Sequence, residues 1–247
     1  MNTLTILRSL TAVTLAVAVT ACAAEKAAAE ERPWCDIFSV DKADLADTGK
    51  NAYFMLVPGY RLILEHGNQR LVISVLDETK VVDGVKTRVV EERETQDGRL
   101  VEVSRNYYAM SRTTGDVYYF GEDVDIYKDG KVTSHKGAWL AGVNGAKFGL
   151  MMPGRPEVGD RYYQELAPGI AMDRAEIISL RERFTTPAKT FERCLRVRET
   201  SGMKSGSEDK LYAYGVGLIK DGNLLLVEVD CPECKSKGVQ HSIRFGQ

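Results

Sequence analysis

The chain has 247 residues, of which 44% are hydrophobic and 28% are charged, and it contains 7 prolines. This balance is typical of a folded protein and excludes a disordered or collagen-like chain. The 33 basic and 35 acidic residues give a formal net charge of -2. Such a charge excludes a general electrostatic attraction to nucleic acid or to an anionic lipid surface.

The N-terminus has the features of a secretory signal peptide. An apolar run extends from Leu10 to Ala21 without an acidic residue, and it is shorter than the roughly 20 residues that a membrane-spanning helix needs. The run ends in Val19-Thr20-Ala21-Cys22, which resembles the bacterial lipobox. We therefore predict export, with residues 1–21 as the signal peptide and Cys22 as the site of lipid attachment. Ordinary signal-peptidase cleavage, which leaves no anchor, is the alternative.

The residues after Cys22 predict a tether and then one folded domain. Residues 23–31 contain no large apolar side chain, so they can bury almost nothing. We expect a lipidated tether at 22–33 and a single β-rich domain at 34–247. The lipid would anchor the protein to a membrane facing the periplasm. By resemblance to lipoprotein sorting, Ala23 favours the outer membrane if the organism is Gram-negative.

Dipeptides that end in glycine recur along the chain and indicate tight turns. They are Asp83-Gly84, Asp97-Gly98, Thr114-Gly115, Asp129-Gly130, Asn144-Gly145 and Asp221-Gly222. Asp-Gly and Asn-Gly suit the type I′ turns that join antiparallel strands. The β-branched and aromatic segments between them predict strands at 86–94, 100–110, 117–127 and 131–140. Consecutive tight turns make this part of the chain an antiparallel meander.

A second β-rich stretch follows. The predicted strands are 161–164, 175–180, 195–200 and 211–214, with a last hairpin that joins 217–220 to 223–229. The segment 171–182 fits a helix or a strand about equally well, and 41–50 predicts a short helical turn. A sheet of this size must close on itself or be covered on its apolar face. We predict a mainly all-β fold, a curved antiparallel meander sheet that forms a half-barrel or barrel with at most short helices.

The two β-rich halves are separated by a segment rich in glycine and proline, 142–169. Trp139, Phe148 and Met151 lie in or beside it, and such side chains favour burial. We therefore expect a crossover or looped lid within the domain, because a flexible linker would lack these residues.

Four motifs resemble a group of uncharacterised secreted bacterial proteins. They are YYFGED at 118–123, GVNGA at 142–146, PGIA at 168–171 and YGVGLI at 214–219. The last motif is also similar to the end of envelope proteins with curved β-sheets, some of which are related in shape to periplasmic lipoprotein carriers. The resemblance implies a curved-sheet fold and supplies no reaction or catalytic residue.

The mature chain has four cysteines besides Cys22, namely Cys35, Cys194, Cys231 and Cys234. In an exported protein, an even number of cysteines predicts two disulfides, here with three connectivities that the sequence does not separate. A copper or zinc site formed by Cys231, Cys234 and His241 is the alternative. Redox catalysis by Cys231-Pro232-Glu233-Cys234 is disfavoured because only 13 residues follow the motif.

Acidic and aromatic residues supply the remaining candidates for a site. The pairs Asp173 with Glu176 and Glu122 with Asp123 could serve acid–base chemistry on a glycan if they faced one cleft. Neighbouring tyrosines on a strand place one ring on each face, so one ring of each pair can line a concave surface. The candidate ligand-facing side chains are Tyr108, Tyr119, Tyr163 and Trp139.

These features predict a lipid-anchored envelope protein that binds a hydrophobic small molecule or an envelope partner, with no cofactor, no reaction and no nucleic acid. An envelope glycan hydrolase and a metal-handling protein are the alternatives.

Overall fold

Tight turns join the long central strands where the sequence predicts them. In this computed structural model, which describes residues 32–231, Asp83 and Gly84 have φ angles of 49° and 76°. Asp97 and Asp129 have φ angles of 52° and 51°, and a glycine follows each. Positive φ at both central residues is typical of the type I′ turn. The strands of this meander are β5 (Gln69–Val82), β6 (Val85–Gln96), β7 (Arg99–Ser111) and β8 (Val117–Lys128).

The N-terminal part of the described chain contributes a hairpin that we did not predict. β4 (Arg61–His66) pairs antiparallel with β5 along its full length. The elements before it are the 3-10 helix η1 (Lys42–Asp44), which fits the predicted helical turn, and the short strands β1 (Leu45–Ala46), β2 (Gly49–Lys50) and β3 (Met55–Leu56). The meander therefore begins one strand pair earlier than predicted.

The segment rich in glycine and proline is the predicted crossover, and short strands form much of it. They are β11 (Lys147–Met152), β12 (Arg161–Tyr163) and β13 (Glu165–Leu166). Before them, the single strand predicted at 131–140 is divided into β9 (Lys131–Ser134) and β10 (Trp139–Leu140), because the chain turns at 135–138. β11 pairs with β8, whereas β12 pairs with β14 (Asp173–Thr185), so the segment connects the two halves of the sheet.

Long antiparallel strands form the second half. After β14 come β15 (Thr190–Ser201), β16 (Ser207–Ala213), β17 (Gly217–Asp221) and β18 (Leu224–Asp230). The ambiguous segment 171–182 is mostly strand, since β14 occupies it from Asp173 onward. β18 pairs with β4, which joins the last described strand to the first long strand pair.

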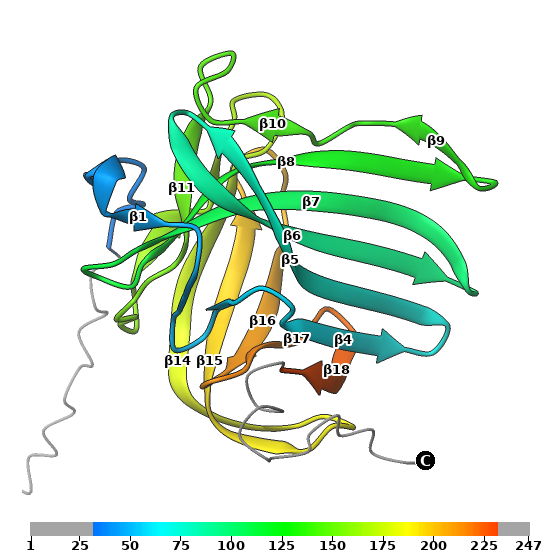
Figure 1. The fold of residues 1–247 in the computed structure, drawn as a ribbon. Coiled ribbons are helices and arrows are strands. Elements are labelled where there is room, and N and C mark those ends of the chain that lie inside the picture. Colours follow the sequence, from blue (N-terminus) through cyan, green and yellow to red (C-terminus); the bar gives the residue numbers. More distant parts are fainter. Residues whose placement is uncertain (1–31, 232–247) are drawn as a thin grey trace, which may run out of the picture. The chain divides into compact units, whose positions relative to one another are not determined.

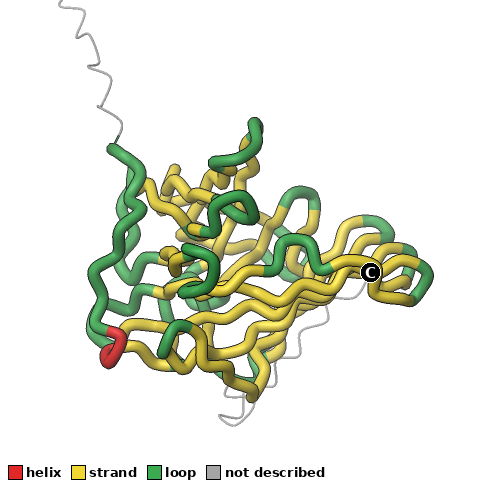
Figure 2. The backbone as a smooth tube through the Cα atoms, turned by 90° about the horizontal axis from the view of Figure 1, so that it is seen from above, coloured by secondary structure: helices red, strands yellow, loops and turns green. Residues whose placement is uncertain are grey.

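The curved antiparallel sheet is nearly a closed barrel with one seam, which confirms the predicted fold class. Its path runs β12-β14-β15-β16-β17-β18-β4-β5-β6-β7-β8-β11-β13. In Figure 1, β5 to β8 form one wall, and β14 to β16 cross behind them as the facing wall. Figure 2 shows that strands make up most of the described chain and that loops gather at their ends. We call the space inside the curved sheet the lumen.

The seam lies where the chain itself connects the two edges of the sheet. The edge strands β12 and β13 are consecutive, and Gln164 alone lies between them. Beside the seam, where β11 pairs with β13, a Cβ atom on Gly149 would lie 2.2 Å from the backbone oxygen of Gln164. Only glycine permits this close approach. The Gln164 side chain is buried, and its Nε2 donates a hydrogen bond of 3.2 Å to Glu199 Oε1 on β15.

The hydrophobic core lies largely on the inner face of the sheet. Its largest fully buried side chains include Phe120, Leu64, Met152, Ile177, Leu195 and Leu226. All described residues belong to one unit, Arg32–Gln247. Within 32–231, no helix has the length and apolar character needed to cross a membrane.

Candidate functional site

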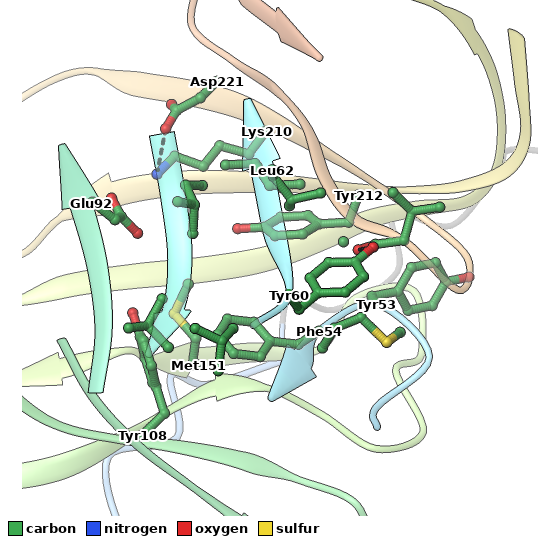
Figure 3. A pocket seen from close by; sticks show the side chains of 17 residues that line it. Tyr53, Phe54, Tyr60, Leu62, Glu92, Tyr108, Met151, Lys210, Tyr212 and Asp221 are labelled. Carbon is green, nitrogen blue, oxygen red and sulfur yellow. Dashed lines mark hydrogen bonds and ion pairs between the residues drawn. The ribbon is translucent and has the colours of Figure 1, made fainter. Parts of the chain in front are cut away.

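A pocket opens on the inner face of the sheet, and we call it the lumen pocket (Figure 3). It is lined by Tyr53, Phe54, Met55, Tyr60, Leu62, Ile73, Val75, Val90, Glu92, Tyr108, Met151, Lys210, Tyr212, Val216, Gly217, Leu218 and Asp221. These side chains come from both halves of the chain and are mostly apolar or aromatic. An apolar cavity with a few polar groups is typical of small-molecule sites.

The lumen pocket is narrow. Its volume is about 70 Å³, and one water needs roughly 10–15 Å³ of such space. It therefore has room for a few waters or one slender group. A long acyl chain does not fit inside it, so the predicted hydrophobic ligand is restricted to a small or slim molecule.

A charged triad lies at one end of the lumen pocket. Lys210 Nζ lies 3.0 Å from Glu199 Oε2 and 3.4 Å from Asp221 Oδ2. Burial alone would lower the pKa of Lys210, but the carboxylates of Glu199 and Asp221 raise it well above its usual range. Lys210 therefore favours its charged form, and its ammonium group is shared between two carboxylates.

Glu92 occupies the same end of the pocket without a partner. Within residues 32–231, its carboxylate has neither a hydrogen bond nor an ion pair, and Figure 3 shows it at the same end as Lys210 and Asp221. Burial raises the pKa of Glu92 to about 7, an effect that Lys210 opposes and Asp221 reinforces. Glu92 thus changes its charge near neutral pH.

Aromatic rings form the walls of the lumen pocket. Tyr108 is 4% exposed and Tyr212 is 3% exposed, yet neither hydroxyl has a hydrogen-bond partner in the described part of the chain. The Phe54 ring packs edge-on against Tyr108 at 5.0 Å between centroids. Tyr60 OH donates a hydrogen bond of 2.8 Å to the backbone oxygen of Val216. The pocket therefore has fixed aromatic faces and two phenol oxygens free to accept or donate.

An open groove adjoins the opposite end of the lumen pocket. Its volume is about 400 Å³, and Met55 and Tyr60 line both the groove and the pocket. These two side chains therefore stand between the two spaces. A molecule longer than the lumen pocket could extend past them into the groove.

The structure distributes the four predicted ligand-facing aromatics over three places. Tyr108 lines the lumen pocket, and Tyr119 stacks on it at 4.7 Å but is buried behind it. Trp139 lines a separate cavity next to Glu122. Tyr163 contacts Trp34 at 6.3 Å between ring centroids and lines none of these spaces.

The neighbour of Tyr163 is the one that faces the lumen. Tyr162 is 2% exposed, and its pKa is raised well above its usual value first by burial and then by Tyr212 and Glu199. Side chains alternate along a strand, so Tyr162 and Tyr163 point to opposite faces of β12. The prediction that each tyrosine pair splits between the faces therefore holds here, but the sequence did not indicate which member faces inward.

The same alternation separates the predicted carboxylate pairs. Glu122 and Asp123 are adjacent on β8 and point in opposite directions, and the Asp123 carboxylate lies 2.9 Å from Lys80 Nζ. Both still line the cavity that Trp139 lines. On β14, Asp173 and Glu176 are three residues apart, so they lie on opposite faces of the sheet.

Glu122 and Glu165 are carboxyl groups that the structure buries on the inner face. Burial raises the pKa of Glu122 to about 9, and nearby Glu165 adds to the rise. Burial also raises the pKa of Glu165 to about 8, with Asp173 adding to it. Both groups are protonated at neutral pH, whereas a glycosidase pair needs one ionised carboxylate.

The cysteines differ from the predicted two-disulfide arrangement. Cys35 and Cys194 are free thiols, the first exposed and the second fully buried on β15, and Cys231 is disulfide-bonded. Cys194 is enclosed by the core, which keeps it from an exposed partner. Cys22, Cys234 and His241 lie outside the described residues. Within 32–231, no cluster of three metal-ligating side chains occurs.

The described residues form one antiparallel β unit with a pocket in its lumen. No protein-family model, curated protein or solved structure matches the chain. The resemblance to secreted bacterial proteins therefore stays a prediction.

Sequence reasoning missed most of the lumen pocket. Glu92, Lys210 and Asp221 are ordinary charged residues of strand segments in the sequence, and nothing near them in the chain indicates a common site. Their meeting requires the facing walls of the sheet. Strand alternation around Val90 and Glu92 was the one local pattern that could have placed Glu92 on the apolar face.

Proposed function

We propose that this protein is a lipid-anchored cell-envelope protein that binds a small hydrophobic molecule in the lumen pocket and catalyses no reaction. The observation that carries the proposal is the apolar, aromatic pocket with a charged end. Such a pocket supplies transfer free energy to a ligand and a few polar groups to orient it.

The size of the pocket favours a small molecule over the other predicted occupants. A segment of a partner protein would need a wider opening than about 70 Å³ provides. A ligand with one slim end in the pocket and its remainder in the adjoining groove is compatible with the walls formed by Met55 and Tyr60.

The carboxyl groups on the inner face favour binding over glycan hydrolysis. Burial raises the pKa of Glu122 to about 9 and that of Glu165 to about 8, so this pair lacks the ionised carboxylate that a glycosidase needs at neutral pH. Asp173 and Glu176 lie on opposite faces of β14. A metal role for Cys231, Cys234 and His241 is less favoured, because the disulfide of Cys231 removes one thiolate ligand.

The pocket is tested by filling it. Leu218 lines the pocket and is partly exposed, so Leu218→Trp introduces a bulky ring there. We expect the wild-type protein to bind the neutral fluorophore N-phenyl-1-naphthylamine, with its phenyl ring in the pocket and its naphthyl group in the adjoining groove, and to increase its emission. The variant should bind it at least tenfold more weakly. Val132→Trp on exposed β9 is the matched control and should bind as the wild type does. Equal binding by Leu218→Trp and the wild type would place the ligand elsewhere.

The anchor is tested separately. In a bacterium that processes lipoproteins, we expect the wild-type chain to incorporate radiolabelled palmitate and to fractionate with membranes. Cys22→Ser should incorporate none and should lose membrane attachment. Palmitate labelling that persists in Cys22→Ser would contradict the anchor.

A further inference from the structure

The lumen pocket has one carboxylate with no counter-charge. Glu92 faces an apolar cavity, and the described residues give it neither a hydrogen bond nor an ion pair. Lys210 is the one cation among the lining residues, and Glu199 and Asp221 already hold it at 3.0 and 3.4 Å. An ionised Glu92 in this place is costly unless the pocket receives a positive charge.

Two buried phenols face the same space with unused hydrogen-bonding capacity. Tyr108 and Tyr212 are 4% and 3% exposed, and within 32–231 neither hydroxyl has a partner. In Figure 3, the Tyr108 hydroxyl points toward Glu92, and the Tyr212 hydroxyl points toward the end of the pocket that holds Glu92 and Lys210. Neither hydroxyl oxygen is among the fully buried polar atoms without a partner, so both are open to the pocket and can donate to or accept from a polar group of a ligand.

The ring faces beside Glu92 suit a cation. Tyr108 and Tyr212 line the charged end of the pocket with Glu92, Phe54 packs against Tyr108, and Tyr60 lines the other end beside the groove. Aromatic faces attract ammonium groups, and cages of such rings recognise quaternary ammonium ligands. The same rings provide apolar area for the body of the ligand.

Further acidic residues lie along β6 and β7 beyond Glu92, and they also favour a cation. Glu94 is directly opposite Glu102 in the register of β6 and β7, two residues further along the strand than Glu92. Like charges at directly opposite positions destabilise a sheet, and a bound cation reduces that repulsion. An anionic ligand would meet Glu92, Glu94 and Glu102, with the positive charge of Lys210 already neutralised.

We propose that the lumen pocket takes a small organic cation, an ammonium group with an apolar body, with Glu92 as its counter-ion and the tyrosine rings as its walls. This inference rests on the proposed function and specifies the class of ligand. Binding of the cation displaces any proton that Glu92 holds, so affinity should increase as the pH rises through about 7, where Glu92 ionises.

Phenyltrimethylammonium and tert-butylbenzene provide a matched test, because the two molecules have the same shape and differ in charge. In calorimetric titrations of the purified protein at pH 8, we expect the cation to bind at least tenfold more tightly than the neutral molecule. Glu92→Gln should lower the affinity for the cation about tenfold and leave the affinity for tert-butylbenzene unchanged. Lowering the pH from 8 to 6 should weaken cation binding by the wild type and leave Glu92→Gln unaffected.

Glu91→Gln is the control, because Glu91 is the adjacent residue of β6 on the opposite face, where it lies 3.6 Å from Arg93. It should bind both molecules as the wild type does. Equal affinity for the two molecules in the wild type would overturn the cation proposal and leave the hydrophobic-ligand proposal intact. If neither molecule binds, both proposals fail.

Discussion

Glu92→Gln should make the protein more stable at neutral and alkaline pH. The folded protein keeps the Glu92 proton up to a pKa of about 7, because burial disfavours the charged form. The unfolded chain releases the same proton near pH 4.5. Folding therefore takes up a proton between these values, and the contribution of Glu92 to the free energy of unfolding falls as the pH rises from 4.5 to 7.

The structure sets the size of the effect. A pKa near 7 in place of 4.5 corresponds to about 3 kcal/mol at about 1.4 kcal/mol per pKa unit. Glutamine keeps the shape of the protonated side chain and has no charge to desolvate. We expect Glu92→Gln to equal the wild type at pH 4 and to exceed its free energy of unfolding by about 3 kcal/mol at pH 8.

Urea unfolding followed by circular dichroism at pH 4, 6 and 8 measures this difference. With slopes of about 1–3 kcal/mol per molar urea, the midpoint at pH 8 should rise by about 1 M or more. Glu91→Gln is again the control and should show no such gain. A difference that is the same at pH 4 and pH 8, or a variant less stable than the wild type at pH 8, would refute the burial argument. If Glu92→Gln is more stable than the wild type and binds the cation more weakly, the loss of binding is not caused by a loss of folding.

Two further predictions concern the triad and the seam. Lys210→Met should destabilise the fold by about 3 kcal/mol in urea unfolding, because it leaves the Glu199 and Asp221 carboxylates without their cation. Adding Glu199→Gln to this variant should recover part of the lost stability. If the effects of the two substitutions simply add, Lys210 and Glu199 are not coupled and the argument is wrong. Gly149→Ala should lower the free energy of unfolding by about 2 kcal/mol, because the added methyl group overpacks against the Gln164 backbone. Amide hydrogen exchange in β12 and β13 should become faster. Unchanged exchange in these strands would show that the two edge strands do not depend on this contact.

The local chemistry of the chain predicts much of the fold. Asp-Gly at 83–84, 97–98 and 129–130 adopts the expected backbone, because aspartate and glycine tolerate positive φ at low cost. Each such turn forces the strands beside it to run antiparallel. The hairpin of β4 and β5, which we did not predict, turns at Gly67-Asn68. This is a weaker turn pattern than Asp-Gly, but the apolar segments on both sides of it are typical of strands.

Export and lipidation are predictions of the sequence alone, since they depend on a short linear pattern that ends at Cys22. That pattern acts through its order of residues and needs no folded domain.

The lumen pocket depends on the tertiary structure. Glu92 on β6, Lys210 on β16 and Asp221 on β17 meet because the sheet curves until its walls face each other. A turn specifies only the pairing of the strands next to it, whereas curvature sums the twist of every strand in the sheet. For the same reason, a one-residue difference in register decides whether a carboxylate such as Glu122 or Asp123 faces the lumen or the solvent.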